Sequence, residues 1–165
     1  MKKIFGVFLL ALALSLVMTS CGPALPSPAV EEGEFDVSVT YEVNGEAKTL
    51  DLVYTCKYEG TAWSLEGASY RDWRGHFKGY GDGDVIEVAS TEDGGKIVLC
   101  FLIYAEYFMG EPEYIQDFHP VVLTNYIYYE DNVEMIEDDQ ELIATEYNVK
   151  ILGIEYDEPI QNTFG

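Results

Sequence analysis

The sequence predicts a mainly β protein: a single antiparallel sandwich or barrel-like domain of about seven to eight strands, with one short helix near the C-terminus. Three observations predict this class. Apolar and polar residues alternate along several segments of strand length. Glycine- and aspartate-rich turns separate those segments. The chain also carries 13 Tyr and 8 Phe, which supply large side chains for a core.

The first two strands have the clearest pattern. Residues 35–43 alternate strictly, and Asn44-Gly45 then supplies the two residues that tolerate the positive φ of a type I′ turn. A returning strand is expected from about Glu46 to Tyr58. The faces expected to be buried are Phe35, Val37, Val39, Tyr41 and Val43 on the first strand, and Leu50, Leu52, Tyr54, Cys56 and Tyr58 on the second.

Further strands are expected wherever β-branched and aromatic residues cluster between turns. The run from Ile97 to Ile103 lacks alternation, which is typical of a central strand covered on both faces. A short helix of about nine residues is expected after Asp138, ending at Asn148 in the left-handed conformation. The strands are expected at Thr61–Leu65, Ser69–Phe77, Asp84–Ser90, Lys96–Tyr104, Val121–Tyr129 and Val149–Tyr156.

Residues 1–20 have the pattern of a secretory signal peptide. Lys2 and Lys3 precede an apolar run from Ile4 to Val17. That run is shorter than the ~20 residues that a permanent transmembrane helix needs. Positive charge, a short apolar run and then small polar residues are the order that such signals share.

The stretch from Leu16 to Gly22, LVMTSCG, resembles a lipobox, with Met18 where leucine is commoner. The resemblance implies cleavage before Cys21 and a diacylglycerol lipid on that cysteine, and therefore an extracytoplasmic, membrane-anchored protein. The whole chain resembles uncharacterised small cell-surface lipoproteins of clostridial-type gut bacteria. These share a lipobox, a Pro/Glu tether and a Tyr-rich acidic domain, and they bring no known activity.

The expected domain layout has three parts. Residues 1–20 form the signal peptide, residues 21–34 the lipidated cysteine and a Pro/Glu-rich tether, and residues 35–165 the acidic β domain. Three prolines between Gly22 and Glu34 favour an extended tether, whose thirteen residues at ~3.1 Å each can lift the domain roughly 40 Å from the bilayer.

The charge of the chain restricts its partners. Removal of residues 1–20 takes away two lysines and no acid, which leaves 7 Lys+Arg against 30 Asp+Glu, a formal charge of −23 over 145 residues. Such a surface repels phosphates, so nucleic-acid binding and direct binding to anionic membranes are disfavoured.

Cys56 and Cys100 allow two interpretations. A disulfide between them is permitted outside the cytoplasm and can stabilise the domain by about 4 kcal/mol. Alternatively, both are buried thiols that act as small apolar side chains. Neither cysteine belongs to a C-x-x-C or Cys/His pattern of a metal or redox site.

One locally basic stretch, residues 70–80, is a candidate ligand site. On a strand, Asp72, Arg74, His76 and Lys78 share one face, and Arg71, Trp73 and Phe77 share the other. The first face can bind an anion or a sugar, or it can be a solvated strand face whose cations pair with acids. The candidate ligand-binding residues are Tyr70, Arg74, His76, Lys78 and Tyr80.

Other candidate sites are weaker. Asp82, Asp84 and Glu87 offer oxygen ligands for Ca²⁺, although a plain hairpin turn with surface acids explains them better. No other metal or cofactor is implied. His76 and His119 are the two histidines, and no catalytic constellation accompanies them. Aromatic residues that can stack on sugars are Trp63, Trp73, Tyr104, Tyr107, Phe108, Tyr114, Tyr126, Tyr128 and Tyr129.

These observations favour a non-enzymatic binding or interaction module at the cell envelope, with a glycan or a protein as its partner. An alternative is a carboxylate-dependent glycan hydrolase, which requires a concave site with two close carboxylates and an aromatic platform. A third hypothesis is an accessory subunit of an envelope complex, which requires an exposed apolar patch.

Overall fold

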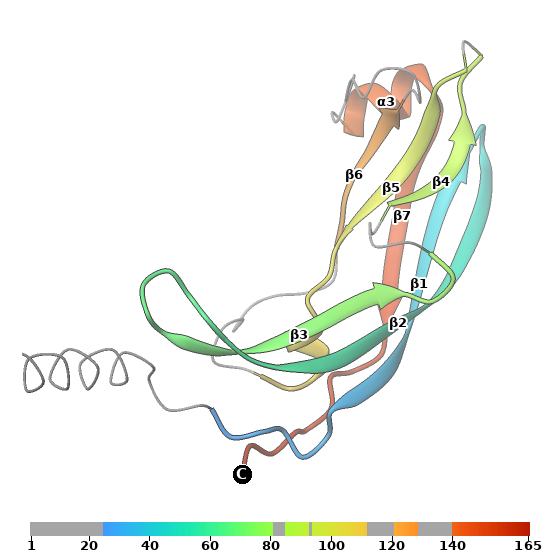
Figure 1. Ribbon diagram of the computed structural model, residues 1–165. Coiled ribbons are helices and arrows are strands. Elements are labelled where there is room, and N and C mark those ends of the chain that lie inside the picture. The colour runs from blue at the N-terminus through green and yellow to red at the C-terminus, as the bar shows by residue number, and fades with distance from the viewer. Residues whose placement is uncertain (1–24, 81–84, 93, 112–120, 129–139) are drawn as a thin grey trace, which may run out of the picture.

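The structure, a computed structural model, describes residues 25–80, 85–92, 94–111, 121–128 and 140–165, and it has the mainly β architecture that the sequence predicts (Figure 1). All strand pairs of its two sheets are antiparallel. One sheet has the order β3-β2-β1-β7 and the other β4-β5-β6. The strands are β1 (Glu32–Val43), β2 (Glu46–Trp63), β3 (Ser69–Phe77), β4 (Val85–Ser90), β5 (Lys96–Leu102), β6 (Val121–Tyr128) and β7 (Val149–Tyr156).

The first hairpin is confirmed. β1 pairs with β2 from Glu32 opposite Lys57 to Val43 opposite Glu46. Asn44 and Gly45 form the turn with φ of 51° and 82°, the conformation that these two residues adopt at low cost. All five predicted core residues of β1 are buried, so the alternation reports the buried face correctly.

β2 is longer than predicted, because the segment at 61–65 is not a separate strand. β2 continues to Trp63, and its pairing with β3 shifts register between Tyr58 and Gly60. Gly60 has φ of 124°, a conformation that glycine adopts without strain, so the chain makes a bulge there and keeps its direction. The other predicted strands match within two residues at each end.

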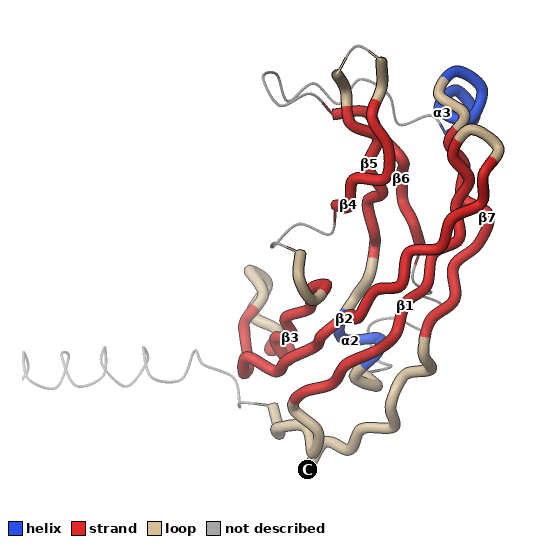
Figure 2. Tube along the Cα trace, turned by 90° about the vertical axis from the view of Figure 1, so that its right-hand side faces the viewer, coloured by secondary structure: helices blue, strands red, loops and turns tan. Residues whose placement is uncertain are grey.

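The core lies between the two sheets, which face each other in Figure 2. Phe77 of β3 packs edge-on against Phe101 of β5 with ring centroids 5.0 Å apart. Tyr54 of β2 donates a hydrogen bond to the Ile103 carbonyl at 3.3 Å. The short helix α2 (Ala105–Phe108), which the sequence did not predict, adds fully buried Phe108 to this core.

The expected C-terminal helix is present as α3 (Gln140–Glu146), and Asn148 ends it with φ of 54°, as predicted. Ile143 of α3 and Val149 of β7 are fully buried, so the helix is packed onto the core. No helix in the described part of the chain has the length and apolarity needed to cross a membrane.

The predicted tether is wrong in its second half. Pro28 is buried and forms a bridge with Phe164. The N–H of Ala29 donates to the Thr163 carbonyl at 2.8 Å, and β1 has already begun at Glu32. The C-terminal residues thus act as a pairing partner for residues 28–30, a contact between chain ends that composition does not reveal.

Of the two interpretations of Cys56 and Cys100, the structure has the free thiols and not the disulfide. Cys56 is buried on the core face of β2. Leu99 and Phe101 of β5 face the core, so Cys100 between them points to the other face of its strand. Burial, together with the charge of Glu106, raises the pKa of the Cys56 thiol to about 12.

Candidate functional site

The basic stretch lies on the exposed face of β3, the edge strand of the larger sheet, and in the turn that follows. As predicted, Trp73 and Phe77 are buried on the opposite face. The five candidate ligand-binding residues are all exposed, and they share no enclosed pocket among the residues that the structure describes: Tyr70, Arg74, His76, Lys78 and Tyr80.

The partners of this face are those of an ordinary strand surface. Lys78 Nζ lies 3.0 Å from Glu34 Oε1, and both side chains are more than half exposed. The Thr55 hydroxyl lies 3.1 Å from the His76 ring and donates to its backbone carbonyl at 3.0 Å. The geometry therefore favours a solvated face with paired cations over a built anion site.

Arg71, on the other face of β3, lies in a buried polar cluster that the sequence reading missed. Its Nη1 donates to Glu111 Oε1 at 2.5 Å, and Trp73 Nε1 donates to Glu111 Oε2 at 2.7 Å. The side chains of Arg71 and Glu111 are 10% and 3% exposed. The Glu111 carboxylate thus accepts a hydrogen bond from each of these two buried donors. Such pairing is needed because an unpaired charge or polar group is costly to bury.

Arg71 also fastens the two ends of the described chain. Its Nε donates to the Pro26 carbonyl at 2.9 Å, and its guanidinium lies 4.0 Å from the centre of the Phe164 ring. Nearby, the Asn162 amide donates to the Val30 carbonyl at 2.8 Å and accepts from the Val30 N–H at 3.0 Å. We call these contacts the terminal clamp.

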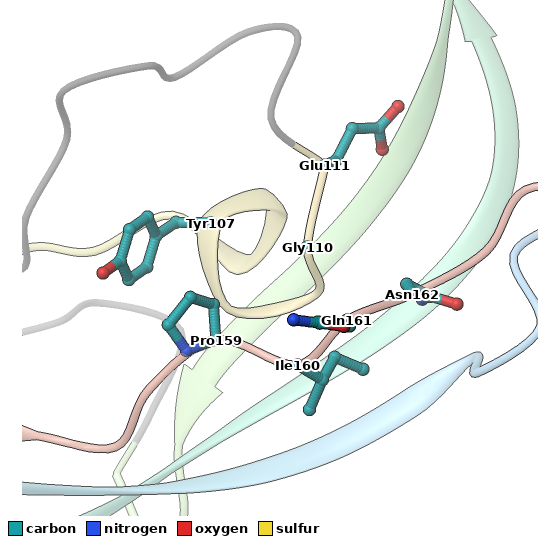
Figure 3. Close-up of a pocket in the computed structure, with 7 residues that line it drawn as sticks. All are labelled: Tyr107, Gly110, Glu111, Pro159, Ile160, Gln161 and Asn162. Carbon is teal, nitrogen blue, oxygen red and sulfur yellow. The ribbon is translucent and has the colours of Figure 1, made fainter.

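A pocket of about 330 Å³ lies beside this clamp (Figure 3). Most of its polar side chains are already engaged: Glu111 holds Arg71 and Trp73, and Asn162 holds Val30. In Figure 3 Tyr107 and Glu111 point in opposite directions, so they do not converge on one ligand. Burial, followed by the neighbouring Tyr156, raises the pKa of Tyr107. The polar side chains of this pocket therefore hold the terminal clamp together and are not arranged around a ligand.

A larger pocket, of about 500 Å³, lies at the other end of the molecule, and we call it the distal pocket. Three turns meet there: the β1–β2 turn, the β4–β5 turn and the α3–β7 turn, at the top of Figure 1. Its volume falls in the range of small-molecule sites. The pocket is lined by Val43, Asn44, Ala89, Ser90, Thr91, Glu92, Ile97, Glu146, Tyr147 and Asn148.

Three polar side chains of the distal pocket are available for a ligand. The side chains of Asn44, Asn148 and Glu146 make no hydrogen bond or ion pair with any residue that the structure describes. Their backbones are held in place, since the Asn44 N–H donates to the Asn148 carbonyl at 2.9 Å. Half-buried Tyr147 packs on the core and supplies an aromatic surface at the pocket.

This arrangement suits a neutral ligand rich in hydroxyl groups. Amide and carboxylate side chains pair with hydroxyls, and an aromatic ring packs on the C–H face of a sugar. An anionic ligand is disfavoured, because Glu92 and Glu146 are the charged residues of the lining.

Within the described residues, no three His, Cys, Asp or Glu side chains lie close enough together to hold a metal ion. Of the candidate Ca²⁺ ligands, Asp82 and Asp84 lie outside the described residues. The histidine His119 also lies outside them. Glu87 lies 3.5 Å from Lys96 Nζ in an ion pair.

Of the nine aromatic residues proposed as a sugar platform, the five whose side chains the structure describes do not assemble at one place. Trp73 and Phe108 are buried in the core, whereas Trp63 and Tyr104 are exposed. Tyr107 lies beside the terminal clamp. The side chains of the remaining four lie outside the described part of the chain: Tyr114, Tyr126, Tyr128 and Tyr129.

No family model, no curated protein and no solved structure matches this chain. The function is therefore argued from the site itself.

The sequence does not predict the distal pocket, although it does predict two of the residues that line the pocket as turn residues. The sequence predicts that Asn44 and Asn148 each end an element with positive φ, and both do so in the structure. Turn ends that meet at one edge of a sandwich commonly carry binding residues. Their meeting in one pocket with Tyr147 depends on how the two sheets pack.

Proposed function

We propose that this protein is a lipid-anchored extracytoplasmic binding module without catalytic activity, and that its distal pocket binds a neutral glycan. One observation carries the proposal: unengaged amide and carboxylate side chains from the β1–β2 and α3–β7 turns line one pocket together with Tyr147. These side chains are exposed at the pocket beside half-buried Tyr147, so they can exchange bound water for the hydroxyl groups of a ligand.

The sequence supports the location. The lipobox around Cys21 implies an anchor, and the terminal clamp keeps the first described residues close to the β domain. The distal pocket lies at the opposite end from those residues (Figure 1). An anchored protein with this layout presents the pocket away from the bilayer.

The anchor is tested by intact mass of the processed protein and by a Cys21→Ser variant. We expect the mass of the thioether lipid on a chain that starts at Cys21, and release of the variant from the membrane fraction. An unchanged membrane fraction for Cys21→Ser contradicts the anchor.

The pocket is tested by thermal unfolding of the Cys21→Ser form with neutral oligosaccharides and peptidoglycan fragments. A glycan at 100 times its dissociation constant adds ~2.7 kcal/mol of stability. The double variant Asn44→Gly/Asn148→Gly removes both amides, and glycine retains the positive φ of both positions. We expect its affinity to fall about tenfold, since each lost hydrogen bond costs ~0.5–1.5 kcal/mol.

Glu146→Gln is the second pocket variant, and Glu66→Gln, in the exposed β2–β3 turn, is its matched control. We expect Glu66→Gln to bind as the unaltered protein does. If no neutral glycan raises the unfolding temperature, or if the pocket variants bind as tightly as the control, the distal pocket is not a glycan site.

A second candidate function, hydrolysis of a glycosidic bond, is favoured by the presence of two glutamates, Glu92 and Glu146, in the same pocket. Glycosidases use such a pair, one carboxyl as the acid and one as the base or nucleophile. Both side chains are exposed, whereas a general acid usually has an apolar environment. Release of reducing ends from a bound glycan, lost in Glu92→Gln/Glu146→Gln, would replace the binding function with this one.

A further inference from the structure

The β2–β3 hairpin carries three large apolar or aromatic side chains that are exposed in the described part of the chain. Trp63 is 40% exposed, Tyr70 is 37% exposed, and Leu65 is fully exposed. The turn itself is well ordered by hydrogen bonds, with the Ser64 N–H donating to the Ala68 carbonyl at 2.8 Å. We call Trp63, Leu65 and Tyr70 the hairpin tip. An ordered turn with an exposed Trp, Tyr and Leu suits a partner with an apolar interior and a polar boundary.

The terminal clamp determines where the anchor can be. Arg71 holds the Pro26 carbonyl at 2.9 Å, and Cys21 lies only five positions before Pro26 in the chain. Five residues span at most ~18 Å, far less than the roughly 40 Å expected for a free tether. A lipid on Cys21 is therefore confined to the neighbourhood of Arg71.

The hairpin tip lies in the same neighbourhood. Arg71 is opposite Thr61 in the β2–β3 pairing, and Leu65 follows Thr61 by four residues, or roughly 13 Å of strand. Both views show the hairpin projecting from the body on the side where the first described residues lie (Figures 1 and 2). A bilayer that holds the lipid is thus within reach of the tip.

The local charge agrees with this placement. Residues 57–78 contain four Lys+Arg and three Asp+Glu, whereas the rest of residues 21–165 contains three Lys+Arg and 27 Asp+Glu. The repulsion from anionic headgroups that disfavours membrane contact for the whole chain is therefore weakest at this hairpin. Trp and Tyr are the side chains that favour the boundary between headgroups and acyl chains.

We propose that the hairpin tip inserts into the headgroup region of the bilayer that carries the Cys21 lipid. The second contact orients the domain, so that the distal pocket faces away from the membrane. This inference rests on the lipid anchor of the proposed function, and not on the ligand of the pocket.

The test uses the lipidated protein in phosphatidylcholine vesicles with brominated or unbrominated acyl chains. Bromine quenches tryptophan fluorescence only at short range, and the chain has two tryptophans, exposed Trp63 and buried Trp73. We expect brominated lipid to reduce the fluorescence of the unaltered protein. A Trp63→Phe variant, which reports Trp73 alone, should show almost no loss.

Leu65→Ser tests the contribution of the apolar tip, and Leu152→Ser, at a half-exposed position of β7, is the matched control. We expect weaker quenching of Trp63 in Leu65→Ser and unchanged quenching in Leu152→Ser. If intact mass shows the lipid but brominated vesicles do not quench Trp63, the tip does not touch the bilayer and the anchor still stands. If the mass shows no lipid, the anchor and this inference both fail.

Discussion

Glu111 is the buried charged residue of the described core, and its position explains several other contacts. Its two oxygens accept hydrogen bonds from Arg71 and Trp73, which belong to the same strand face two residues apart. Arg71 in turn reaches Pro26 and Phe164. A single carboxylate therefore connects β3 to both ends of the described chain.

Glu111→Gln should strongly destabilise the domain. Without the carboxylate, the buried guanidinium of Arg71 loses its counter-charge, and breaking such a pair costs ~3–5 kcal/mol. The double variant Arg71→Met/Glu111→Gln should recover part of this loss, because no unpaired buried charge remains. Urea unfolding measures both.

Glu59→Gln provides the comparison, since Glu59 forms an exposed ion pair with Lys57 at 3.3 Å. Exposed pairs contribute ~0–1 kcal/mol, so this variant should unfold almost as the unaltered protein does. Equal losses for Glu111→Gln and Glu59→Gln would show that the buried cluster does not stabilise the fold.

Glu106 predicts a pH dependence of stability. Burial raises the pKa of its carboxyl above 4.5, and the charges of Glu111 and Asp72 raise it further. A raised pKa in the folded state means that the contribution of Glu106 is complete below pH 4.5 and is lost as the pH rises through the folded value. Glu106→Gln should therefore stabilise the domain at pH 7, and the gain should shrink towards pH 4.

Urea unfolding at the two pH values measures this difference, with Glu66→Gln as the exposed control. A gain for Glu106→Gln that is the same at pH 4 and pH 7 would mean that ionisation of Glu106 is not its cause.

Among the elements, β3 depends on a glycine that its strand pattern does not explain. Gly75 lies opposite Cys56 of β2, and the Tyr54 ring fills the space where a Cβ would be. Tyr54 is buried and hydrogen-bonded to Ile103, so its ring cannot easily move. The absence of a side chain at Gly75 allows the aromatic packing of Tyr54 and Phe77.

Gly75→Ala should lower the unfolding temperature, because the added methyl overlaps the Tyr54 ring. Such overpacking typically costs ~1–3 kcal/mol. Gly153→Ala in β7 is the matched control, since a Cβ there meets no atom within 4 Å and the backbone φ is not positive. We expect the control to be neutral or slightly stabilising. Equal unfolding temperatures for the two variants would contradict the overlap.

For the whole molecule, the main feature is an acidic domain with two different ends. One end carries the terminal clamp and the exposed hairpin, and the other carries the distal pocket (Figure 1). Residues 21–165 carry a formal charge of −23. Self-repulsion of like charges destabilises a compact state, and salt screens it.

The unfolding temperature should therefore rise with NaCl between low and moderate ionic strength, where the Debye length falls from ~30 Å to ~10 Å. Choline chloride should give a similar increase, because screening does not depend on the identity of the cation. An increase with Ca²⁺ alone would instead indicate a specific cation site, and a decrease with both salts would contradict the repulsion.

The sequence by itself determined the elements of this protein. Alternation with a period of two identified the buried faces of β1 and β2, and Asn44-Gly45 and Asn148 identified two element ends. These features depend on side-chain direction and backbone φ, which are local properties. It also predicted the face that β3 presents to solvent.

Only the tertiary structure decided how those elements combine. It separated Cys56 from Cys100, brought Glu111 to Arg71 across 40 positions, and joined three distant turns into the distal pocket. It also placed the start of the folded domain within the segment expected to be a tether, because Pro28 forms a bridge with Phe164. Each of these contacts joins residues far apart in the chain, and their pairing follows from the packing of two sheets, which no local pattern encodes.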